Sequence, residues 1–423
     1  MKSVIIQGWI VFSAACSLFV ISQFYKSCMA VITPQLMADL SLGAKGLGLV
    51  SAAFYYTFAL TQLPMGVYLD RIGPRITMTV LSLISVAGVV IFAFSYSLTM
   101  SVIGRALLGV GMACNLMGTF KLLTLWFSPL RFATLSTTIV SIGAMGTITS
   151  STPLVLLVET FGWRHVFVGF GVLTLITTVI FYLVVRDKSH ETPYGVPLRE
   201  TSKQGPAPGL GTLFRNKDYW IISVAAFARL GIFFAFQGLW AGPYLMQVME
   251  LSPVKTGNLI LILNIGFILG GPFFGMMSDR VMKTRKWIIT VGLNVLFLHM
   301  LIMALLPPGT GLLTLTVLFF SFGIFGSSGM VMYTQIKELM PPDMSGTALA
   351  GINFFGFVGA AGFLHGVGNL MHYLYPDASF GPEAFKIAFL VCAACFVFVS
   401  ILYMFTTDTK GGAPVQKAMA LKT

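Results

Sequence analysis

The chain has 423 residues, of which 56% are hydrophobic and only 9% are charged. This apolar share excludes an ordinary soluble protein, because one core cannot bury so much apolar surface, and it predicts an all-α integral membrane protein. The net charge of +12 does not indicate nucleic-acid binding, because most Lys and Arg lie in loops that we assign to one side of the membrane. By the positive-inside rule that side is the cytoplasm, so we expect a multi-pass inner-membrane protein with both termini cytoplasmic.

Apolar runs of about twenty residues recur along the chain, which is the length that a helix needs to cross ~30 Å of hydrocarbon. The first half contains runs near residues 8–38, 45–69, 76–96, 98–127, 132–158 and 163–186. The second half contains runs near residues 218–248, 254–278, 287–306, 310–337, 345–374 and 384–406. The pattern therefore predicts twelve transmembrane helices.

Residues 187–217 separate the two sets of runs and are rich in Pro, Gly and charge. This segment buries too little apolar surface to fold alone, so we interpret it as a cytoplasmic linker with a short surface helix near Leu213. The predicted domains are a six-helix bundle over residues 1–186, this linker, a second six-helix bundle over residues 218–406, and a cytoplasmic tail over residues 407–423.

Two short stretches of sequence repeat at an offset of 209 residues. They are Gly66-x-x-x-Asp70-Arg71 with Gly275-x-x-x-Asp279-Arg280, and Pro34-x-Leu36 with Pro243-x-Leu245. A repeat of half the chain length predicts two pseudo-symmetric bundles of six spans each. Two parallel repeats of membrane helices are typical of secondary transporters.

The loop after the second run, Gly66-x-x-x-Asp70-Arg71-x-Gly73-x-Arg75, resembles the cytoplasmic signature loop of the major facilitator superfamily. Further likenesses to that family are Arg105-x-x-x-Gly109-x-Gly111 and Gly162-Trp163-Arg164. The resemblance covers the whole chain and implies the fold of that family and transport by alternating access. It also implies gating by the loop and its second copy: Asp70, Arg71, Gly73, Arg75, Asp279 and Arg280. We expect Asp70 and Arg71 to pair with each other and with the end of a neighbouring helix in one conformation only.

Within this superfamily the chain looks most like anion:cation symporters and organophosphate antiporters. Those carriers have a basic residue eight positions before the proline of the first span, and this chain has Lys26 before Pro34. Tyr25 and Met112 stand where many of the symporters have acids. The resemblance therefore implies an organic-anion substrate, moved by anion exchange or together with protons bound to the substrate itself.

Four basic side chains fall inside the predicted spans: Lys26, Arg105, Lys121 and Arg229. Every Asp and Glu falls in a loop or near the end of a span. A cation inside the bilayer is costly unless it faces protein or water, and beside a water-filled cavity it is a site for an anion. We therefore predict substrate contacts for Lys26 and Arg229, with pairing to backbone carbonyls as the structural alternative. We also predict a substrate contact for Arg105, where the resemblance implies the alternatives of ordering its span or assisting proton movement. Lys121 lies near the cytoplasmic end of its span, where we expect its ammonium to extend to the membrane interface.

Lys26 and Arg229 lie in the first span of each half but do not occupy equivalent positions of the repeat. Their registers differ by six residues, roughly 9 Å along a helix at 1.5 Å per residue. We expect the two cations to hold opposite ends of one substrate.

Neutral polar residues complete the predicted substrate site: Gln23, Tyr55, Asn115, Gln237 and Asn353. Gln23 and Gln237 lie one and two helical turns from the cation of their own span, so each can share its face. Hydrogen bonding between helices is the alternative for the two asparagines. Of the two histidines inside spans, we interpret His299 as structural and His365 as the candidate proton carrier.

The sequence thus predicts a carrier that takes up a small organic anion, a carboxylate or a phosphate-bearing metabolite. Alternatives are a carrier of amino acids or other zwitterions, an exporter of amphipathic compounds and, from another class, a ligand sensor built like a transporter. An enzyme is not expected, because no Ser/His, paired-Asp or His/Glu arrangement has useful spacing. We expect no cofactor and no metal, a monomer in the lipid bilayer, and a co-transported or exchanged ion beside the substrate.

Overall fold

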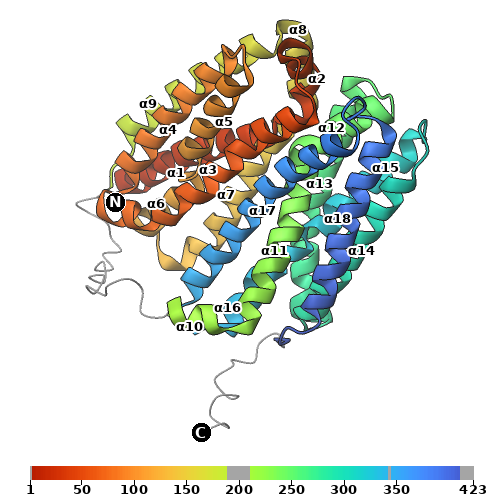
Figure 1. The fold of residues 1–423 in the computed structure, drawn as a ribbon. Helices are drawn as coiled ribbons and strands as arrows, with labels where there is room; N and C mark the ends of the chain where they lie inside the picture. Colours follow the sequence, from red (N-terminus) through yellow and green to blue (C-terminus); the bar gives the residue numbers. More distant parts are fainter. Residues whose placement is uncertain (1, 188–209, 342–343, 410–423) are drawn as a thin grey trace. The chain divides into compact units, whose positions relative to one another are not determined.

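Helices account for all regular structure in the residues that the computed structural model describes, 2–187, 210–341 and 344–409 (Figure 1). Eleven stretches of helix within these ranges are long and apolar enough to cross a membrane. The remaining predicted span is α3 (Ala44–Arg71), which is long enough but more polar, because Tyr55, Tyr56 and Gln62 interrupt its apolar surface. The described helices thus agree with the predicted all-α fold of twelve spans.

The chain divides into two compact units. The first comprises residues 1–202 and 252–258, and the second comprises residues 203–251 and 259–423. Most of the predicted linker and most of the predicted tail lie outside the described residues. The short helix expected near Leu213 is present as α10 (Leu210–Arg215). The domain boundaries at residues 186 and 218 stay predictions.

Three of the six spans in the first unit are each made of two helices. The helices of this half are α1 (Lys2–Ser27), α2 (Met29–Leu40), α3, α4 (Pro74–Ala93), α5 (Leu98–Met112), α6 (Asn115–Trp126), α7 (Pro129–Thr149), α8 (Thr152–Phe161) and α9 (Trp163–Val184). The interruptions lie at residues 28, 113–114 and 150–151. Ser27 Oγ beside the first break and Ser150 Oγ at the third are 2.7 Å apart, so these two breaks lie side by side. Serine hydroxyls at such sites compete with the helix for backbone carbonyls.

The seventh and tenth spans, in the second half of the chain, also depart from a regular α-helix. The segments of this half are α11 (Lys217–Ala235), η1 (Phe236–Trp240), α12 (Ala241–Pro243), η2 (Tyr244–Val248), α13 (Pro253–Met276), η3 (Met277–Val281), α14 (Lys286–Leu305), α15 (Leu312–Gly326), η4 (Ser327–Gly329), α16 (Met330–Leu339), α17 (Ser345–Leu374) and α18 (Pro382–Tyr403). The π-helical turns η1 and η2 lie in the seventh span, and the 3-10 turn η4 separates α15 from α16 in the tenth. These two spans are the repeat counterparts of the first and fourth spans, which are also interrupted. The break in the fifth span and the turn η3 have no counterpart in the continuous helices α17 and α3.

Glycines allow helices to pack closely inside each unit. A Cβ atom at Gly88 of α4 would lie 2.7 Å from the backbone nitrogen of Leu108 in α5. A Cβ atom at Gly231 of α11 would lie 2.7 Å from the carbonyl carbon of Gly359 in α17. Small residues at such contacts are the usual solution in lipid, where helix association depends on van der Waals packing.

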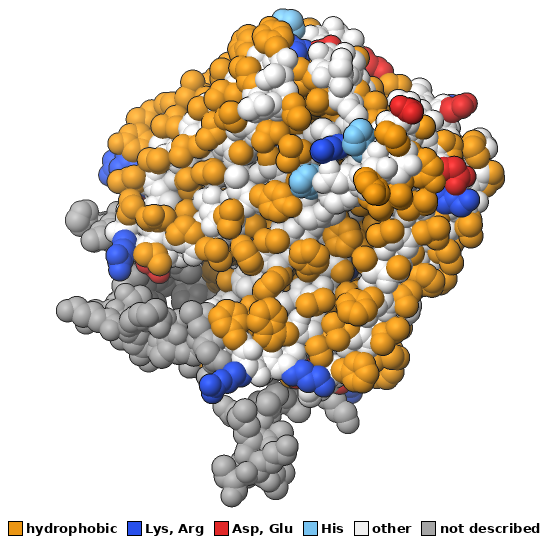
Figure 2. Space-filling view, in the orientation of Figure 1, with side chains coloured by type: hydrophobic (Ala, Val, Ile, Leu, Met, Phe, Trp, Pro, Cys, Tyr) orange, Lys and Arg blue, Asp and Glu red, His pale blue; other side chains and the backbone are white. Residues whose placement is uncertain are grey.

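The surface of the protein is apolar, as a lipid-facing surface must be. Large hydrophobic side chains such as Leu63, Leu183 and Leu313 are more than 60% exposed. Figure 2 shows hydrophobic side chains over most of the face in view, with few charged side chains among them.

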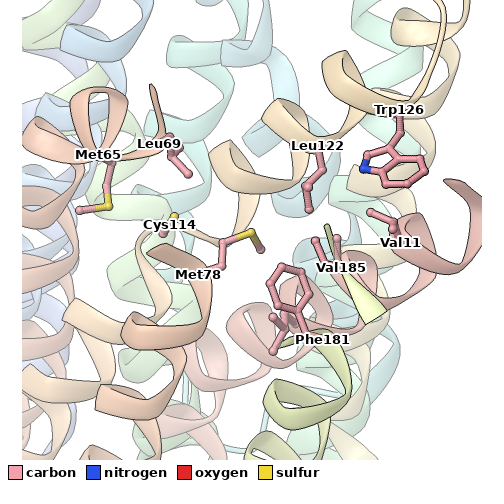
Figure 3. Close-up of a cluster of buried hydrophobic side chains, with 11 residues drawn as sticks. Val11, Met65, Leu69, Met78, Cys114, Leu122, Trp126, Phe181 and Val185 are labelled. Carbon is pink, nitrogen blue, oxygen red and sulfur yellow. The ribbon is translucent and has the colours of Figure 1, made fainter. Parts of the chain in front are cut away.

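A buried apolar cluster in the first unit holds both ends of the loop between α3 and α4. Its members are Val11, Ala15, Leu18, Met65, Leu69, Met78, Cys114, Leu122, Trp126, Phe181 and Val185. Figure 3 shows side chains of this cluster converging from different helices. Leu69 precedes the loop and Met78 follows it, so packing of these two side chains fixes the loop between them.

Candidate functional site

The break between α1 and α2 leaves backbone carbonyls at the end of α1 without helical partners. Arg105 Nη1 donates to the carbonyl of Tyr25 at 2.9 Å, and the Tyr55 hydroxyl donates to the carbonyl of Lys26 at 3.1 Å. The last carbonyls of a helix need such donors, and a cation there also interacts favourably with the helix dipole. Three predicted site residues, Lys26, Tyr55 and Arg105, therefore meet at this break.

Lys26 is the half-buried cation of this group. Its Nζ lies 5.4 Å from the ring centroid of Phe58, which is within cation–π range. Gln23, one turn earlier on α1, is also half-buried. Gln23 and Lys26 are thus both half-buried on the first span, and their substrate contacts stay predictions.

Arg105 is fully buried, in contrast to Lys26. Its guanidinium carbon lies 4.8 Å from the ring centroid of Phe54, and Nη1 also contacts Cys28 Sγ at 3.9 Å. Its Nε and Nη2 have no hydrogen-bond partner among the described residues. One nitrogen of Arg105 therefore serves the backbone of the first span, and the substrate contact stays a prediction.

Arg229, on α11 of the second unit, is 0% exposed. None of its Nε, Nη1 and Nη2 atoms has a hydrogen-bond partner in the part of the chain that the structure describes. The phenol groups of Tyr333 and Tyr403 lie near enough to interact electrostatically with it. A buried guanidinium without a partner is costly, so an anion that pairs with Arg229 gains the full interaction.

The two tyrosines near Arg229 are held by side-chain amides. The Tyr333 hydroxyl donates to Asn353 Oδ1 at 3.2 Å, and the Tyr403 hydroxyl donates to Gln335 Oε1 at 2.6 Å. Asn353, a predicted site residue, thus holds one of the two tyrosines that interact with Arg229, and its substrate contact stays a prediction.

Gln237 and Asn115 connect helices. Gln237 Nε2 donates to Asn264 Oδ1, which joins the seventh span to the eighth. Asn115 Nδ2 donates to the carbonyl of Leu18 at 3.4 Å and to Met112 Sδ at 3.2 Å, next to the break between α5 and α6. Both amides are thus engaged in packing between or within spans, which is the alternative stated for Asn115, and their substrate contacts stay predictions.

Asp70, in the last turn of α3, pairs with Lys121 of α6. Lys121 Nζ lies 2.6 Å from Asp70 Oδ1, and Arg71 is exposed. At the end of its span the Lys121 ammonium thus meets a carboxylate of the second span, a partner that the sequence analysis did not name. The expected pair of Asp70 with Arg71 does not form among the described residues, whereas the expected contact of Asp70 with a neighbouring helix does.

Gly73 and Arg75 contact Asp187, which follows the last helix of the first half. Gly73 has φ of +94°, and a Cβ atom there would lie 2.5 Å from Asp187 Oδ2, so only glycine fits. Asp187 Oδ1 accepts the backbone N–H of Arg75 at 2.8 Å. Burial raises the pKa of the Asp187 carboxyl above its usual range, and the Arg75 N–H and charge partly oppose this rise.

The second copy of the loop forms a larger charged cluster. Arg285 pairs with Asp279 and, at 2.8 Å from Nη2 to Oε1, with Glu338 at the end of α16. The hydrogen bond to Glu338 is the main reason that the pKa of Arg285 lies above its usual range. Arg280, the other predicted gating residue here, is exposed.

The two histidines inside spans differ in their surroundings. His299 Nδ1 lies 2.7 Å from the carbonyl of Val295 and Nε2 lies 2.7 Å from Ser321 Oγ, so the structural interpretation of His299 is confirmed. His365 is half-buried on α17, and its role as proton carrier stays a prediction.

Asp187, Glu338 and Asp408 are charged partners that the sequence analysis did not name. Asp408 accepts the backbone N–H groups of Arg285 and Lys286 at 3.1 and 3.0 Å. Asp187 and Asp408 both stand a few residues after the last span of their half. That shared position was the signal from which the sequence could have identified these two residues, because no local motif surrounds either of them.

Comparisons with known proteins agree with this architecture. The profile described as the Major Facilitator Superfamily matches residues 14–364. The hexuronate transporter of Bacillus subtilis (strain 168) is 26% identical over 407 residues, covering 90% of both chains. The "Probable hexose phosphate transport protein" of Chlamydia trachomatis serovar D is 23% identical over 411 residues, covering 89% of this chain and 86% of that one.

Among solved structures, a D-xylose-proton symporter superimposes with a TM-score of 0.76 at 15% identity, covering 96% of this chain and 99% of that one. This likeness concerns the fold, and it agrees with the predicted all-α architecture. The family match extends over most of the chain and confirms the resemblance seen in the signature loop. The protein is accordingly a membrane transporter and not an enzyme, and it belongs to the Major Facilitator Superfamily.

Proposed function

We propose that the protein takes up a small organic anion, a carboxylate or a phosphate-bearing metabolite, by alternating access. The observation that carries the proposal is the guanidinium of Arg229, which is 0% exposed and has no hydrogen-bond partner among the described residues. The printed names of the relatives, a hexuronate transporter and a hexose phosphate transport protein, support the same class of substrate.

The two cations have complementary chemistry in this proposal. A guanidinium presents its donors as a planar fork that matches a carboxylate or a phosphate, whereas an ammonium acts as a point charge. Arg229 binds the principal anionic group, and Lys26 supplies a second positive charge from the first span. Gln23 and Asn353, near Lys26 and Arg229 respectively, bind polar groups of the substrate.

How substrate transport is coupled to another ion depends on Tyr25 and Met112, which stand where related carriers have acidic residues. Tyr25 and Met112 carry no proton at neutral pH that they can release, so the protein exchanges anions or moves protons bound to the substrate. A coupled proton carried by the protein and not by the substrate would instead use His365. We place the protein in the inner membrane as a monomer with both termini in the cytoplasm, because most Lys and Arg then lie on the cytoplasmic side.

A thermal-shift screen with the purified protein tests the proposal. The probes are D-glucuronate, D-glucarate, glucose 6-phosphate and, as zwitterions, glycine and L-glutamine. A probe at 100 times its Kd stabilises the folded state by about 2.7 kcal/mol. We expect stabilisation by at least one anion, accompanied by uptake of that anion into proteoliposomes.

Three variants decide which residues carry the binding. Lys26→Gln and Arg229→Gln should remove both the anion-dependent stabilisation and uptake. Lys45→Gln is the matched control, because Lys45 is an exposed lysine at the start of α3, and it should behave as wild type. Stabilisation by zwitterions alone, or normal anion uptake by Lys26→Gln or Arg229→Gln, would contradict the assignment.

A further inference from the structure

The guanidinium of Arg229 lies against a piece of backbone that has no side chain. The turn η4 (Ser327–Gly329) joins α15 to α16, and Gly329 is its last residue. A Cβ atom built on Gly329 would overlap Cζ, Nε and Nη1 of Arg229. The space that the guanidinium occupies is therefore the space that any other residue at position 329 would fill.

A second contact, one helical turn away, fixes the position of α11 along α15 and η4. The ring of Phe233, four residues after Arg229 on α11, takes the Cβ position of Gly326, three residues before Gly329. Phe233 is stacked on Phe267 at 4.8 Å and on Phe322 at 5.6 Å between ring centroids. Because these two rings hold Phe233 in place, a rotation of α11 that moves Arg229 away from Gly329 would break both ring contacts.

The contact with Gly329 does not satisfy the guanidinium. Gly329 offers Arg229 room but accepts no hydrogen bond from it, and the three nitrogens stay without partners among the described residues. A side chain at position 329 would push the guanidinium out of its place while adding no partner for it. The size of the side chain at position 329 thus determines where the Arg229 guanidinium lies, and it does not change the charge of that group.

We propose that Gly329 is a positioning residue for Arg229 and that its missing side chain sets the affinity of the transporter for the anionic group of its substrate. This inference rests on the proposed function, because it assumes that Arg229 binds that group. It adds a residue that never touches the substrate, in a turn that the sequence analysis did not assign.

The first experiment measures the contact itself, without any substrate. Gly329→Ala should lower the melting temperature, and Gly329→Ala combined with Arg229→Ala should regain stability, because removing the guanidinium leaves room for the new methyl group. Gly271→Ala is the matched control: it is also a glycine within a helix of this unit, and no other atom lies within 4 Å of its Cβ position. A double variant that is no more stable than Gly329→Ala would overturn the proposal.

The second experiment measures affinity, with whichever of D-glucuronate, D-glucarate and glucose 6-phosphate binds the wild type most tightly. We expect Gly329→Ala to weaken binding by about tenfold, ~1.4 kcal/mol, while Gly271→Ala keeps the wild-type affinity. Adding Arg229→Lys should restore part of the lost affinity, because a lysine head group is narrower than a guanidinium. A merely structural role for Gly329 would not give this rescue.

The outcomes separate the two proposals. Wild-type affinity in Gly329→Ala overturns the role of Gly329 and leaves the proposed function intact. If the wild type binds none of the three anions, the proposed function fails. The melting temperatures of Gly329→Ala and of the double variant with Arg229→Ala then still decide whether the turn accommodates the guanidinium. If Gly329→Ala does not fold, recovery of folding in the double variant supports the contact and its absence overturns it.

Discussion

Asp187 and Asp408 occupy the same place in the two halves of the protein. Asp187 accepts the backbone N–H of Arg75 in the first turn of α4, and Asp408 accepts those of Arg285 and Lys286 at the start of α14. Each carboxylate follows the last span of its half and reaches the start of the third span of the same half. Both satisfy free N–H groups at a helix N-terminus, where negative charge is also favoured by the helix dipole.

Removing either carboxylate should destabilise the protein. We expect Asp187→Ala and Asp408→Ala each to cost about 0.5–2 kcal/mol, the usual loss for a helix cap. Asp187→Asn should cost less than Asp187→Ala, because the amide keeps an acceptor oxygen and burial already disfavours the charged carboxyl. Thermal unfolding in detergent measures these changes, with the exposed Asp377→Ala as control. Equal losses for Asp187→Asn and Asp187→Ala would show that charge, not the acceptor, matters.

The pair of Asp70 and Lys121 should affect transport more than stability. Its side chains are 51% and 27% exposed, so solvent screens their attraction and we expect less than about 1 kcal/mol of stability. Asp70→Asn and Lys121→Gln should each slow uptake, and the double variant should be no slower than either single variant, because both remove one contact. Uptake by proteoliposomes measures this coupling. Additive losses would mean that the two residues act separately.

The cluster around Arg285 should, in contrast, contribute to stability. The Arg285 side chain is only 7% exposed and pairs with both Glu338 and Asp279. We expect Glu338→Gln to cost more than Asp279→Asn, because the Glu338 side chain is 28% exposed and that of Asp279 is 60% exposed. Breaking a fully buried pair costs about 3–5 kcal/mol, so we expect smaller losses for these partly exposed pairs. The order of the two melting temperatures tests the prediction, and the reverse order would contradict it.

The contributions of Arg105 to stability and to transport can be measured separately. Arg105→Met removes the guanidinium donor to the carbonyl of Tyr25 and leaves the Cys28 thiol as a weaker donor, which we expect to cost about 1–3 kcal/mol. Arg105→Lys keeps a donor, so it should regain part of that stability. Melting temperatures and the KM for uptake are measured on the same preparations. A KM that rises in Arg105→Lys despite regained stability would assign the remaining nitrogens to the substrate, and an unchanged KM would assign Arg105 to structure alone.

The spans and the repeated loop were predictable because they follow from composition and from short local spacings. Lys26, Arg105 and Arg229 were recognisable as interior cations because a charge in an apolar run is conspicuous in any register. The partners of these residues were not predictable. Whether Lys121 reaches Asp70 depends on how α6 is rotated against α3, and whether Arg229 meets Gly329 depends on how α11 is rotated against η4, and one sequence fixes neither rotation.

The interruptions within the first and fourth spans could not be predicted from the sequence either. The run near 8–38 is apolar on both sides of Cys28, and Pro34 lies six residues beyond the interruption. The run near 98–127 is interrupted at residues 113–114 without a proline. These breaks depend on donors from other spans, such as Arg105 and Tyr55, which compensate the lost backbone hydrogen bonds.

The dependence of the first span on Tyr55 and Arg105 has a consequence for biosynthesis. The first span leaves the ribosome before the second and fourth spans, which carry these two donors, so its break has no compensating hydrogen bonds when it enters the membrane. Exposed carbonyls in hydrocarbon cost several kcal/mol each. We therefore expect the newly made first span to be a straight helix or to wait in the translocation channel, and to adopt its final shape only after the fourth span has been inserted.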